Sequence, residues 1–266
     1  MDLGIKGRTA LITGGAGGMG TETAKLLLQE GCNVVITDLD ADEVEKAVAE
    51  LGDGAFGVAA DLTKNADCEK VAKFAKDKAG HPDILVSAAG VTGAKGHPLT
   101  EITDDDWEEV WQTNFMSAVK IMRQILPGMA EKGWGRVVIV TSENAVQPYW
   151  EEAVYNTAKA ALLNLSKGLS RNYAHDGVLI NAVSPAFIET PMTDGMMEKK
   201  AEEEGISFDE AIEKFLDEDR PYLELKRRGR SDEVAAVIAL LVSEKASFVN
   251  GANYRVDGGA VATMSV

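Results

Sequence analysis

The sequence predicts an α/β fold in which a parallel sheet of about seven strands is covered by helices on both faces. Short apolar, β-branched runs alternate with longer amphipathic stretches along nearly the whole chain, and this βαβα alternation is typical of parallel sheets. Right-handed crossovers make such a sheet doubly wound. Neither a repeat nor a low-complexity linker divides the chain, so we expect a single domain spanning residues 1–266.

The expected strands are short apolar runs bounded by turn residues. The fifth run contains four consecutive branched residues, which need burial on both faces of the sheet. In chain order, the strands are expected at residues 8–13, 33–37, 55–60, 83–87, 136–142, 178–184 and 253–256.

The expected helices have apolar residues at helical spacing. They cover residues 20–30, 41–51, 66–79, 104–130, 153–174 and 232–242. A helical insertion, or lid, is expected after the sixth strand, at about residues 189–225. The insertion is strongly acidic, and its methionines favour an adaptable cover over a cleft.

The charge balance excludes several kinds of partner. Lys and Arg number 27 and Asp and Glu number 43, so the formal net charge is −16. Nucleic acids and anionic membranes are therefore not expected partners, because both require a basic face. The chain shows neither a membrane-spanning run nor a secretory signal, so a cytoplasmic location is expected.

The cysteine and histidine content predicts neither a disulfide framework nor a metal site. Cys32 and Cys68 form no CxxC pair, and buried free thiols are the expected state. The three histidines are scattered, and no cluster has metal-ligand spacing, so we expect no metal.

A glycine-rich turn, TGGAGGMG at residues 13–20, follows the first strand and opens the first helix. Glycines let the backbone approach a pyrophosphate, and the helix N-terminus offers free N–H groups. Two alignments of the motif are possible. Gly15, Gly17 and Gly20 match GxGxxG, whereas Gly14, Gly18 and Gly20 match TGxxxGxG.

Asp38 indicates which dinucleotide this turn would bind. It ends the second strand, eighteen residues after Gly20, near the spacing of a carboxylate that binds the adenosine ribose. A 2′-phosphate would be repelled there, and neither Gly17 nor Leu39 supplies a neutralising cation. The sequence therefore favours NAD over NADP.

Tyr155 and Lys159 lie four residues apart on a predicted helix and share one of its faces. An ammonium beside a phenol lowers the pKa of the phenol, which would make Tyr155 a general acid and base. Ser142, thirteen residues earlier, lies at the carboxyl end of the fifth strand, where ligands bind in open α/β sheets. Tyr222 and Lys226 have the same spacing but lie in the insertion, without such a serine.

Together these residues resemble the short-chain dehydrogenase/reductase family, in its shorter single-domain branch, over nearly the whole chain. The resemblance implies a Rossmann-like fold. The motifs that carry it are residues 13–20, Asp38, residues 61–63, Asn114, Ser142, Tyr155, Lys159, Pro185, Ile188, Thr190 and residues 256–259.

The resemblance also implies roles for individual residues. Tyr155 would exchange a proton with the substrate oxygen, and Ser142 would hydrogen-bond that oxygen. Lys159 would hold the nicotinamide ribose, and Asn114 would support a proton-relay water. The expected cofactor-binding residues are Gly14, Gly17, Gly18, Met19, Gly20, Asp38, Leu39, Asp61, Leu62, Ala88, Ala89, Gly90, Tyr155, Lys159, Pro185, Ile188 and Thr190.

Two positions depart from the family pattern. Ala88 stands where the family usually has an asparagine amide, which puts a contact near the adenosine in doubt. Ala186 replaces the usual glycine after Pro185. The residues expected to contact substrate are Ser142, Asn144, Tyr149, Trp150, Tyr155 and Met192.

These observations predict reversible, NAD-dependent hydride transfer between a secondary alcohol and a ketone of low molecular mass. Two alternatives remain open. One is reduction of 3-oxoacyl thioesters, for which Lys132, Arg136, Arg171 and residues 227–230 could dock an acidic carrier protein. The other is an NAD-binding protein without catalysis. The resemblance also implies a homotetramer.

Overall fold

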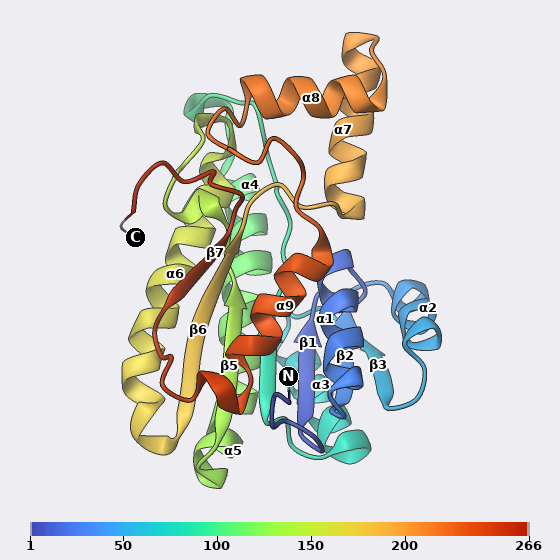
Figure 1. Cartoon of the computed structure of the whole chain (residues 1–266), viewed down its shortest axis with the longest axis vertical. Coiled ribbons are helices and arrows are strands. Elements are labelled where there is room, and N and C mark those ends of the chain that lie inside the picture. The colour runs from blue at the N-terminus through green and yellow to red at the C-terminus, as the bar shows by residue number, and fades with distance from the viewer. Residues whose placement is uncertain (1, 265–266) are drawn as a thin grey trace.

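Seven parallel strands form one sheet within residues 2–264, which are the residues that the computed structural model describes (Figure 1). The sheet order is β3-β2-β1-β4-β5-β6-β7, so the order reverses between β1 and β4. The predicted doubly wound α/β fold is confirmed. Residues 1, 265 and 266 of the expected domain lie outside the described residues. The strands are β1 (Thr9–Thr13), β2 (Asn33–Asp38), β3 (Ala55–Ala59), β4 (Ile84–Ser87), β5 (Gly135–Val140), β6 (Val178–Pro185) and β7 (Asn253–Val256).

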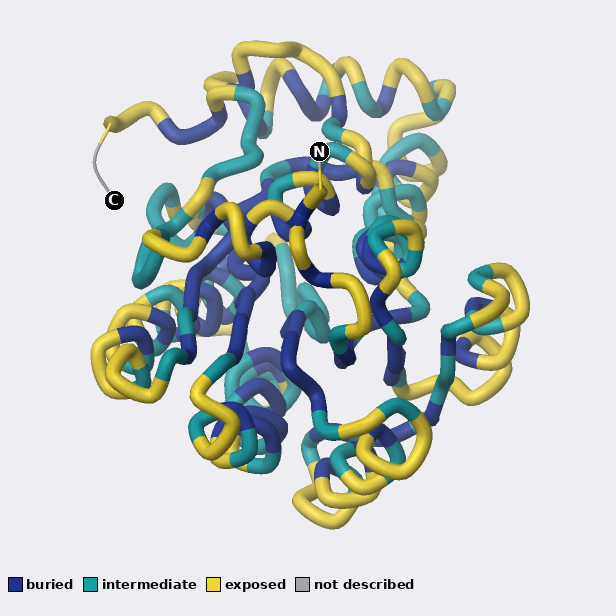
Figure 2. Tube along the Cα trace, turned by 60° about the horizontal axis from the view of Figure 1, so that its bottom comes forward, coloured by how far each residue is buried: buried dark blue, intermediate teal, exposed yellow. Residues whose placement is uncertain are grey.

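Helices cover both faces of this sheet. One face packs against α1 (Gly18–Gln29), α2 (Ala41–Leu51) and α9 (Ser231–Leu241). The opposite face packs against α3 (Asn65–Ala79), α5 (Ser117–Lys132) and α6 (Ala153–Tyr173). Figure 2 shows the strands as the buried centre and the helices with exposed outer sides.

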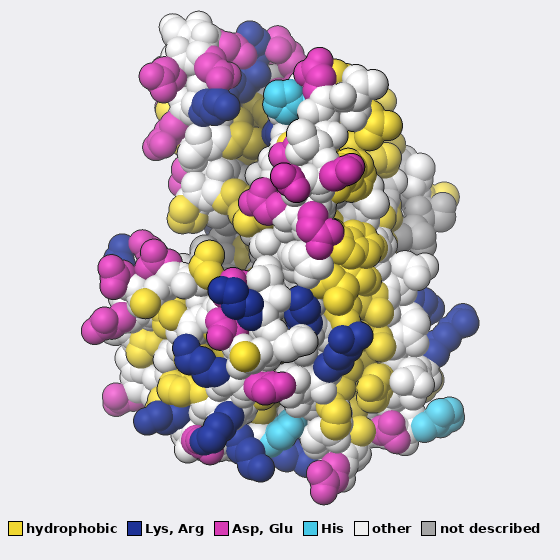
Figure 3. All heavy atoms as spheres, turned by 180° about the vertical axis from the view of Figure 1, so that it is seen from behind, with side chains coloured by type: hydrophobic (Ala, Val, Ile, Leu, Met, Phe, Trp, Pro, Cys, Tyr) yellow, Lys and Arg dark blue, Asp and Glu magenta, His cyan; other side chains and the backbone are white. Residues whose placement is uncertain are grey.

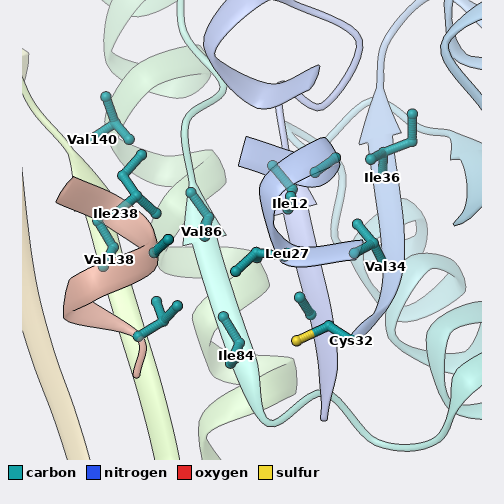
Figure 4. Packing of buried hydrophobic residues seen from close by; sticks show 14 of the residues in the cluster. Ile12, Leu27, Cys32, Val34, Ile36, Ile84, Val86, Val138, Val140 and Ile238 are labelled. Carbon is teal, nitrogen blue, oxygen red and sulfur yellow. The ribbon is translucent and has the colours of Figure 1, made fainter. Parts of the chain in front are cut away.

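Alternate residues of each central strand enter different cores. Ile12 and Val86 pack with Leu27 of α1 and Ile238 of α9 on one face (Figure 4). Their neighbours Leu11 and Leu85 belong to the core on the other face. This arrangement explains why the strands read as continuous apolar runs rather than as alternating patterns.

The helix expected at residues 104–130 is interrupted. Helix α4 (Asp104–Val110) is followed by a π-helical turn (Trp111–Met116), which leads into α5. Ser117 Oγ donates a hydrogen bond of 2.5 Å to the Thr113 carbonyl and so satisfies one backbone acceptor in the widened turn. Such turns occur often at functional sites, and this one contains Asn114.

The expected helical pair after the sixth strand is present as α7 (Pro191–Glu204) and α8 (Phe208–Glu218). Side chains of Thr190 and Ser207 cap their N-termini. The pair projects from the body above α9 (Figure 1). Phe187, Met197, Phe215 and Leu223 form a separate apolar cluster that joins the projection to the end of β6.

The cysteines are free and buried, as predicted. Among residues 2–264, no helix has the length and apolar character needed to cross a membrane. Over the same residues, no group of three or more His, Cys, Asp or Glu side chains is arranged to hold a metal ion.

Candidate active site

A cavity of about 540 Å³ opens at the carboxyl ends of β1, β2 and β4, where the strand order reverses. Ligands bind at this position in open α/β sheets. Figure 3 shows a hollow between the projecting α7–α8 pair and the body. The predicted site residues that line the cavity are Gly14, Gly17, Gly18, Met19, Gly20, Asp38, Leu39, Asp61, Leu62, Ala88, Ala89, Gly90, Thr190 and Met192.

The glycine turn fits a pyrophosphate. Gly14 has a φ of 66°, and a Cβ there would lie 2.9 Å from the Ala88 carbonyl carbon. A Cβ on Gly20 would lie 2.2 Å from the Gly14 carbonyl oxygen. The N-cap residue of α1, Gly17, has no capping side chain, which leaves the helix N–H groups available to an anion. Gly15 does not line the cavity, so the geometry favours the TGxxxGxG alignment.

Asp38 links the glycine turn to the second strand. Its Oδ2 accepts a hydrogen bond of 3.2 Å from the Ala16 backbone N–H, and its Oδ1 accepts one of 2.9 Å from Leu39 N–H. The carboxylate is therefore fixed at the wall of the cavity. A hydroxyl group could donate to it there, whereas a phosphate would meet like charge.

Asp61 lies on the same wall but is occupied by its neighbours. Its Oδ1 accepts hydrogen bonds from Thr63 N–H at 3.0 Å and Thr63 Oγ1 at 2.6 Å. The Thr63 hydroxyl is the main cause of a lowered Asp61 pKa. The carboxylate is thus held ionised in a local turn.

The four residues of the expected catalytic set, Asn114, Ser142, Tyr155 and Lys159, lie together beside this cavity. Lys159 Nζ lies 5.5 Å from the Tyr155 ring centroid and donates to the Val140 carbonyl at 3.0 Å. Asn114 Oδ1 and Lys159 Nζ would lie 3.1 and 3.6 Å from a Cβ built on Gly90. The Tyr155 hydroxyl is hydrogen-bonded to Ser142. The structure therefore brings together all four residues of the expected catalytic set.

The electrostatics of Tyr155 differ from the prediction. Burial, followed by the nearby Glu143 carboxylate, raises the pKa of Tyr155 above its ordinary value. Burial also lowers the pKa of Lys159 to about 8. The expectation that Lys159 lowers the pKa of Tyr155 is therefore wrong for the protein alone, because desolvation opposes both charged forms.

Sequence reasoning missed a charged cluster next to Ser142. It consists of the buried side chains of Glu143, Glu152 and Arg220 and of the half-buried Lys95. Ser142 Oγ donates to Glu143 Oε2 at 2.7 Å. Arg220 Nη2 donates to Glu152 Oε1 at 3.0 Å, and Lys95 Nζ lies 2.5 Å from that same oxygen. An acidic residue directly after a buried strand was the available signal for Glu143.

The expected substrate contacts divide into two groups. Asn144 is buried, and its amide donates to Asn156 Oδ1 at 2.8 Å and to Glu152. Tyr149 packs under Arg220, with the guanidinium carbon 3.6 Å from the ring centroid. Trp150, by contrast, is 70% exposed, and Met192 lies in the wall of the nucleotide-sized cavity.

Four residues that were expected to contact the cofactor are not among those that line the main cavity: Tyr155, Lys159, Pro185 and Ile188. Ile188 forms a parallel bridge with Gly229 and lines a second cavity of about 220 Å³. A Cβ on Gly229 would lie 2.5 Å from Ile188 Cδ1, so the absence of a side chain there admits the isoleucine. The pairing of these distant segments determines this orientation.

Comparison with known proteins identifies the family. Residues 14–261 match the family model described as enoyl-(acyl carrier protein) reductase. Dehydrogenase/reductase SDR family member 4 of Oryctolagus cuniculus is 32% identical over 96% of this chain and 94% of its own. The chain belongs to the short-chain dehydrogenase/reductase family.

Other short-chain dehydrogenases and reductases match along their whole length. D-beta-hydroxybutyrate dehydrogenase of Cupriavidus necator is 32% identical over 97% of this chain and 99% of its own. The crystal structure of L-sorbose reductase from Gluconobacter frateurii, complexed with NADPH and L-sorbose, superimposes with a TM-score of 0.92. It is 31% identical and covers 99% of this chain and 100% of its own.

Proposed function

We propose that this short-chain dehydrogenase/reductase interconverts secondary alcohols and ketones of low molecular mass with NAD(H). The observation that carries the proposal is the position of Tyr155. Its hydroxyl interacts with Ser142, and its ring lies beside Lys159. This group lies next to a cavity that has the glycine turn of a dinucleotide site. The related hydroxybutyrate dehydrogenase and sorbose reductase support an alcohol or ketone as substrate.

The residues of the chain divide the proton handling among them. Tyr155 gives its proton to a ketone oxygen or takes one from an alcohol, and Ser142 bonds the same oxygen. Lys159, held by the Val140 carbonyl, supplies positive charge when protonated. Asn114 fixes the loop that starts at Val91 against this group. A bound nicotinamide would supply or accept the hydride.

Asp38 supports NAD as the preferred nucleotide. The sorbose reductase was solved with NADPH, so family membership alone leaves the choice open. Here a fixed carboxylate stands at the cavity wall, and the next residue is the exposed Leu39 rather than a cation. A 2′-phosphate placed against this carboxylate would have no compensating charge.

The thioester-reductase alternative is less well supported. Five cations that could dock an acidic carrier protein already have acidic partners. They are Lys132 with Asp83, Arg136 with Glu244, Arg228 with Asp194, Arg227 with Glu233 and Arg230 with Asp232. A non-catalytic nucleotide-binding protein would leave the convergence of Tyr155, Ser142 and Lys159 unexplained.

We also propose that the chain forms a homotetramer. An apolar band runs along the face that Figure 3 shows, on the side of α5 and α6. Apolar surface of this kind is typical of contacts between subunits. Sedimentation equilibrium tests the proposal, and a monomeric mass at micromolar concentration would contradict it.

The test of the proposed activity is a screen of secondary alcohols with NAD and with NADP, read as absorbance of the reduced nucleotide. We expect turnover with NAD and a lower kcat/KM with NADP. Heat of binding, measured by calorimetry, separates the possibilities when no alcohol reacts. Binding without turnover would support the non-catalytic alternative, and absence of binding would overturn the proposed function.

A further inference from the structure

The Ser142 hydroxyl has one proton and is surrounded mainly by acceptors. Glu143 Oε2 lies 2.7 Å from Ser142 Oγ, and Asn144 Oδ1 lies 3.1 Å from it. Ser142 Oγ also accepts from the Asn144 backbone N–H at 3.2 Å. A hydroxyl donates only once but accepts twice. The shorter bond, to a carboxylate, therefore takes the proton whenever that carboxylate is ionised.

The orientation of the Asn144 amide is fixed by its other partners. Its Nδ2 donates to Asn156 Oδ1 at 2.8 Å, and it also bonds Glu152. The amide oxygen is consequently the atom that faces Ser142, and it cannot give a proton to that hydroxyl. Tyr155 is the remaining polar neighbour of Ser142, and it receives no proton from a Ser142 hydroxyl that donates to Glu143.

We propose that Glu143 is a positioning residue that sets the direction of the hydrogen bond between Ser142 and the reacting oxygen. When Glu143 is ionised, Ser142 donates to Glu143 and has no proton left for Tyr155 or for a substrate oxygen. When Glu143 is protonated, it donates to Ser142. The Ser142 proton is then free to point at a substrate carbonyl oxygen. Only the hydroxyl rotates, and the one proton gained by Glu143 comes from solvent.

The surroundings of Glu143 allow both protonation states. It is 3% exposed, and its other oxygen lies 3.8 Å from Arg220 Nε, outside hydrogen-bond distance. Burial raises the pKa of Glu143 to about 7, with Arg220 opposing this shift and Glu152 adding to it. The charged or titratable groups around Glu143 are Arg220, Glu152, Tyr149 and Tyr155, with Lys95 behind Glu152.

This inference rests on the proposed function and determines how that function depends on pH. A ketone oxygen is an acceptor, so it gains the bond from Ser142 only while Glu143 holds a proton. Ketone reduction should therefore decline as Glu143 ionises. With a pKa of about 7, the protonated fraction falls about tenfold between pH 6 and pH 8.

Infrared titration tests the proposal without any substrate. In the nucleotide-free protein, the difference spectrum between pH 6 and pH 8 should contain the C=O band of a protonated carboxyl. We expect Glu143→Gln to remove this band and Glu143→Asp to retain a shifted one. A wild-type spectrum without the band, or a band that Glu143→Gln leaves in place, would overturn the proposal. Because no turnover is needed, failure of the proposed function cannot produce either result.

The pH dependence of ketone reduction is the second test. A glutamine at 143 can turn its oxygen toward Arg220 and donate through Nε2 to Ser142, which imitates protonated Glu143. We expect the kcat/KM of the wild type to fall about twentyfold from pH 6 to pH 8, about tenfold through Glu143 and about twofold through Lys159. The kcat/KM of Glu143→Gln should fall by no more than about twofold, because only Lys159 still loses its proton over this range. Glu143→Asp keeps a titrating carboxyl and should again show the larger fall. Parallel profiles for all three proteins would reduce Glu143 to a structural role.

Discussion

Asn114 and Val91 are joined by two hydrogen bonds that use both ends of the asparagine amide. Asn114 Oδ1 accepts from Val91 N–H at 2.7 Å, and Nδ2 donates to the Val91 carbonyl at 2.9 Å. Asn114 is fully buried in the π-helical turn, and Val91 follows β4. The side chain therefore ties the loop after β4 to the helix beside Lys159.

Replacing Asn114 with Asp should destabilise the fold. The substitution keeps the shape but removes the donor to Val91 and places two acceptors against each other, at a cost of about 3 kcal/mol. Urea denaturation followed by circular dichroism measures this loss. Asn164→Asp, on the exposed side of α6, is the matched control and should unfold near the wild-type midpoint. Equal midpoints for both variants would contradict a stabilising role for the two hydrogen bonds between Asn114 and Val91.

Tyr155→Phe should lower kcat by about 10²–10⁴-fold, because the general acid and base is removed. Nucleotide affinity should change little, since the ring and Lys159 remain. Steady-state kinetics and calorimetry check the two expectations separately. Tyr222→Phe is the control. It removes the phenol of the other Tyr-x-x-x-Lys pair, in which Tyr222 is 53% exposed, and should keep the wild-type kcat. Substantial turnover by Tyr155→Phe would refute its role.

Asp38→Ala should weaken the preference for NAD over NADP. Removing the carboxylate removes both the ribose acceptor and the repulsion of a 2′-phosphate. We expect the ratio of kcat/KM values to shift toward NADP by about tenfold or more, or about 1.4 kcal/mol. Asp40→Ala deletes the N-cap of α2 and should cost about 1 kcal/mol of stability with no such shift. An unchanged ratio in Asp38→Ala would remove the basis for proposing NAD.

Arg220→Met should cost more stability than an exposed arginine does. The substitution removes the guanidinium, so Glu143 and Glu152 stay buried with Lys95 as the neighbouring cation. Breaking a buried ion pair costs about 3–5 kcal/mol. The stacking on Tyr149 is lost as well. Arg227→Met breaks the more exposed bond to Glu233 and should unfold at nearly the wild-type temperature. Scanning calorimetry compares the two, and similar melting temperatures would be inconsistent with the buried cluster.

Glu143 should also make stability depend on pH. Its folded pKa of about 7 lies above its ordinary value, so the folded state holds a proton that the unfolded state has released. The stabilisation is therefore fully present below about pH 4.5 and is lost as pH rises toward 7. Glu143→Gln should lack this loss between pH 5 and pH 7. Denaturation midpoints at the two pH values, compared between variant and wild type, provide the measurement.

The strands and the catalytic set were predictable because their signals are local. The apolar runs that form β1, β4 and β5 lie between turn residues, and Tyr155 and Lys159 share one helix face whatever surrounds them. The interruption of the helix at Trp111–Met116 was not predictable, since neither glycine nor proline marks it and π and α turns leave similar apolar patterns.

The remaining differences from expectation arose from contacts between distant segments. Ile188 turns away from the main cavity because its segment pairs with Gly229, which no local pattern announces. The raised pKa of Tyr155 depends on Glu143 and on burial, and burial is a property of the finished fold. The sequence therefore predicted that the four catalytic residues meet, but neither the charged cluster beside them nor the protonation equilibria of Tyr155 and Lys159.

Arg220 makes two distant parts of the chain depend on each other, so that they have to be exchanged together. It follows α8 in the insertion, yet the carboxylates it compensates belong to residues 143 and 152, beside the catalytic serine. A chimera that took its α7–α8 segment from a relative without a cation at this position would leave both buried carboxylates without the charge of Arg220. Exchange of substrate specificity through this segment should therefore succeed only when the donor segment and the acidic residues beneath it are transplanted together.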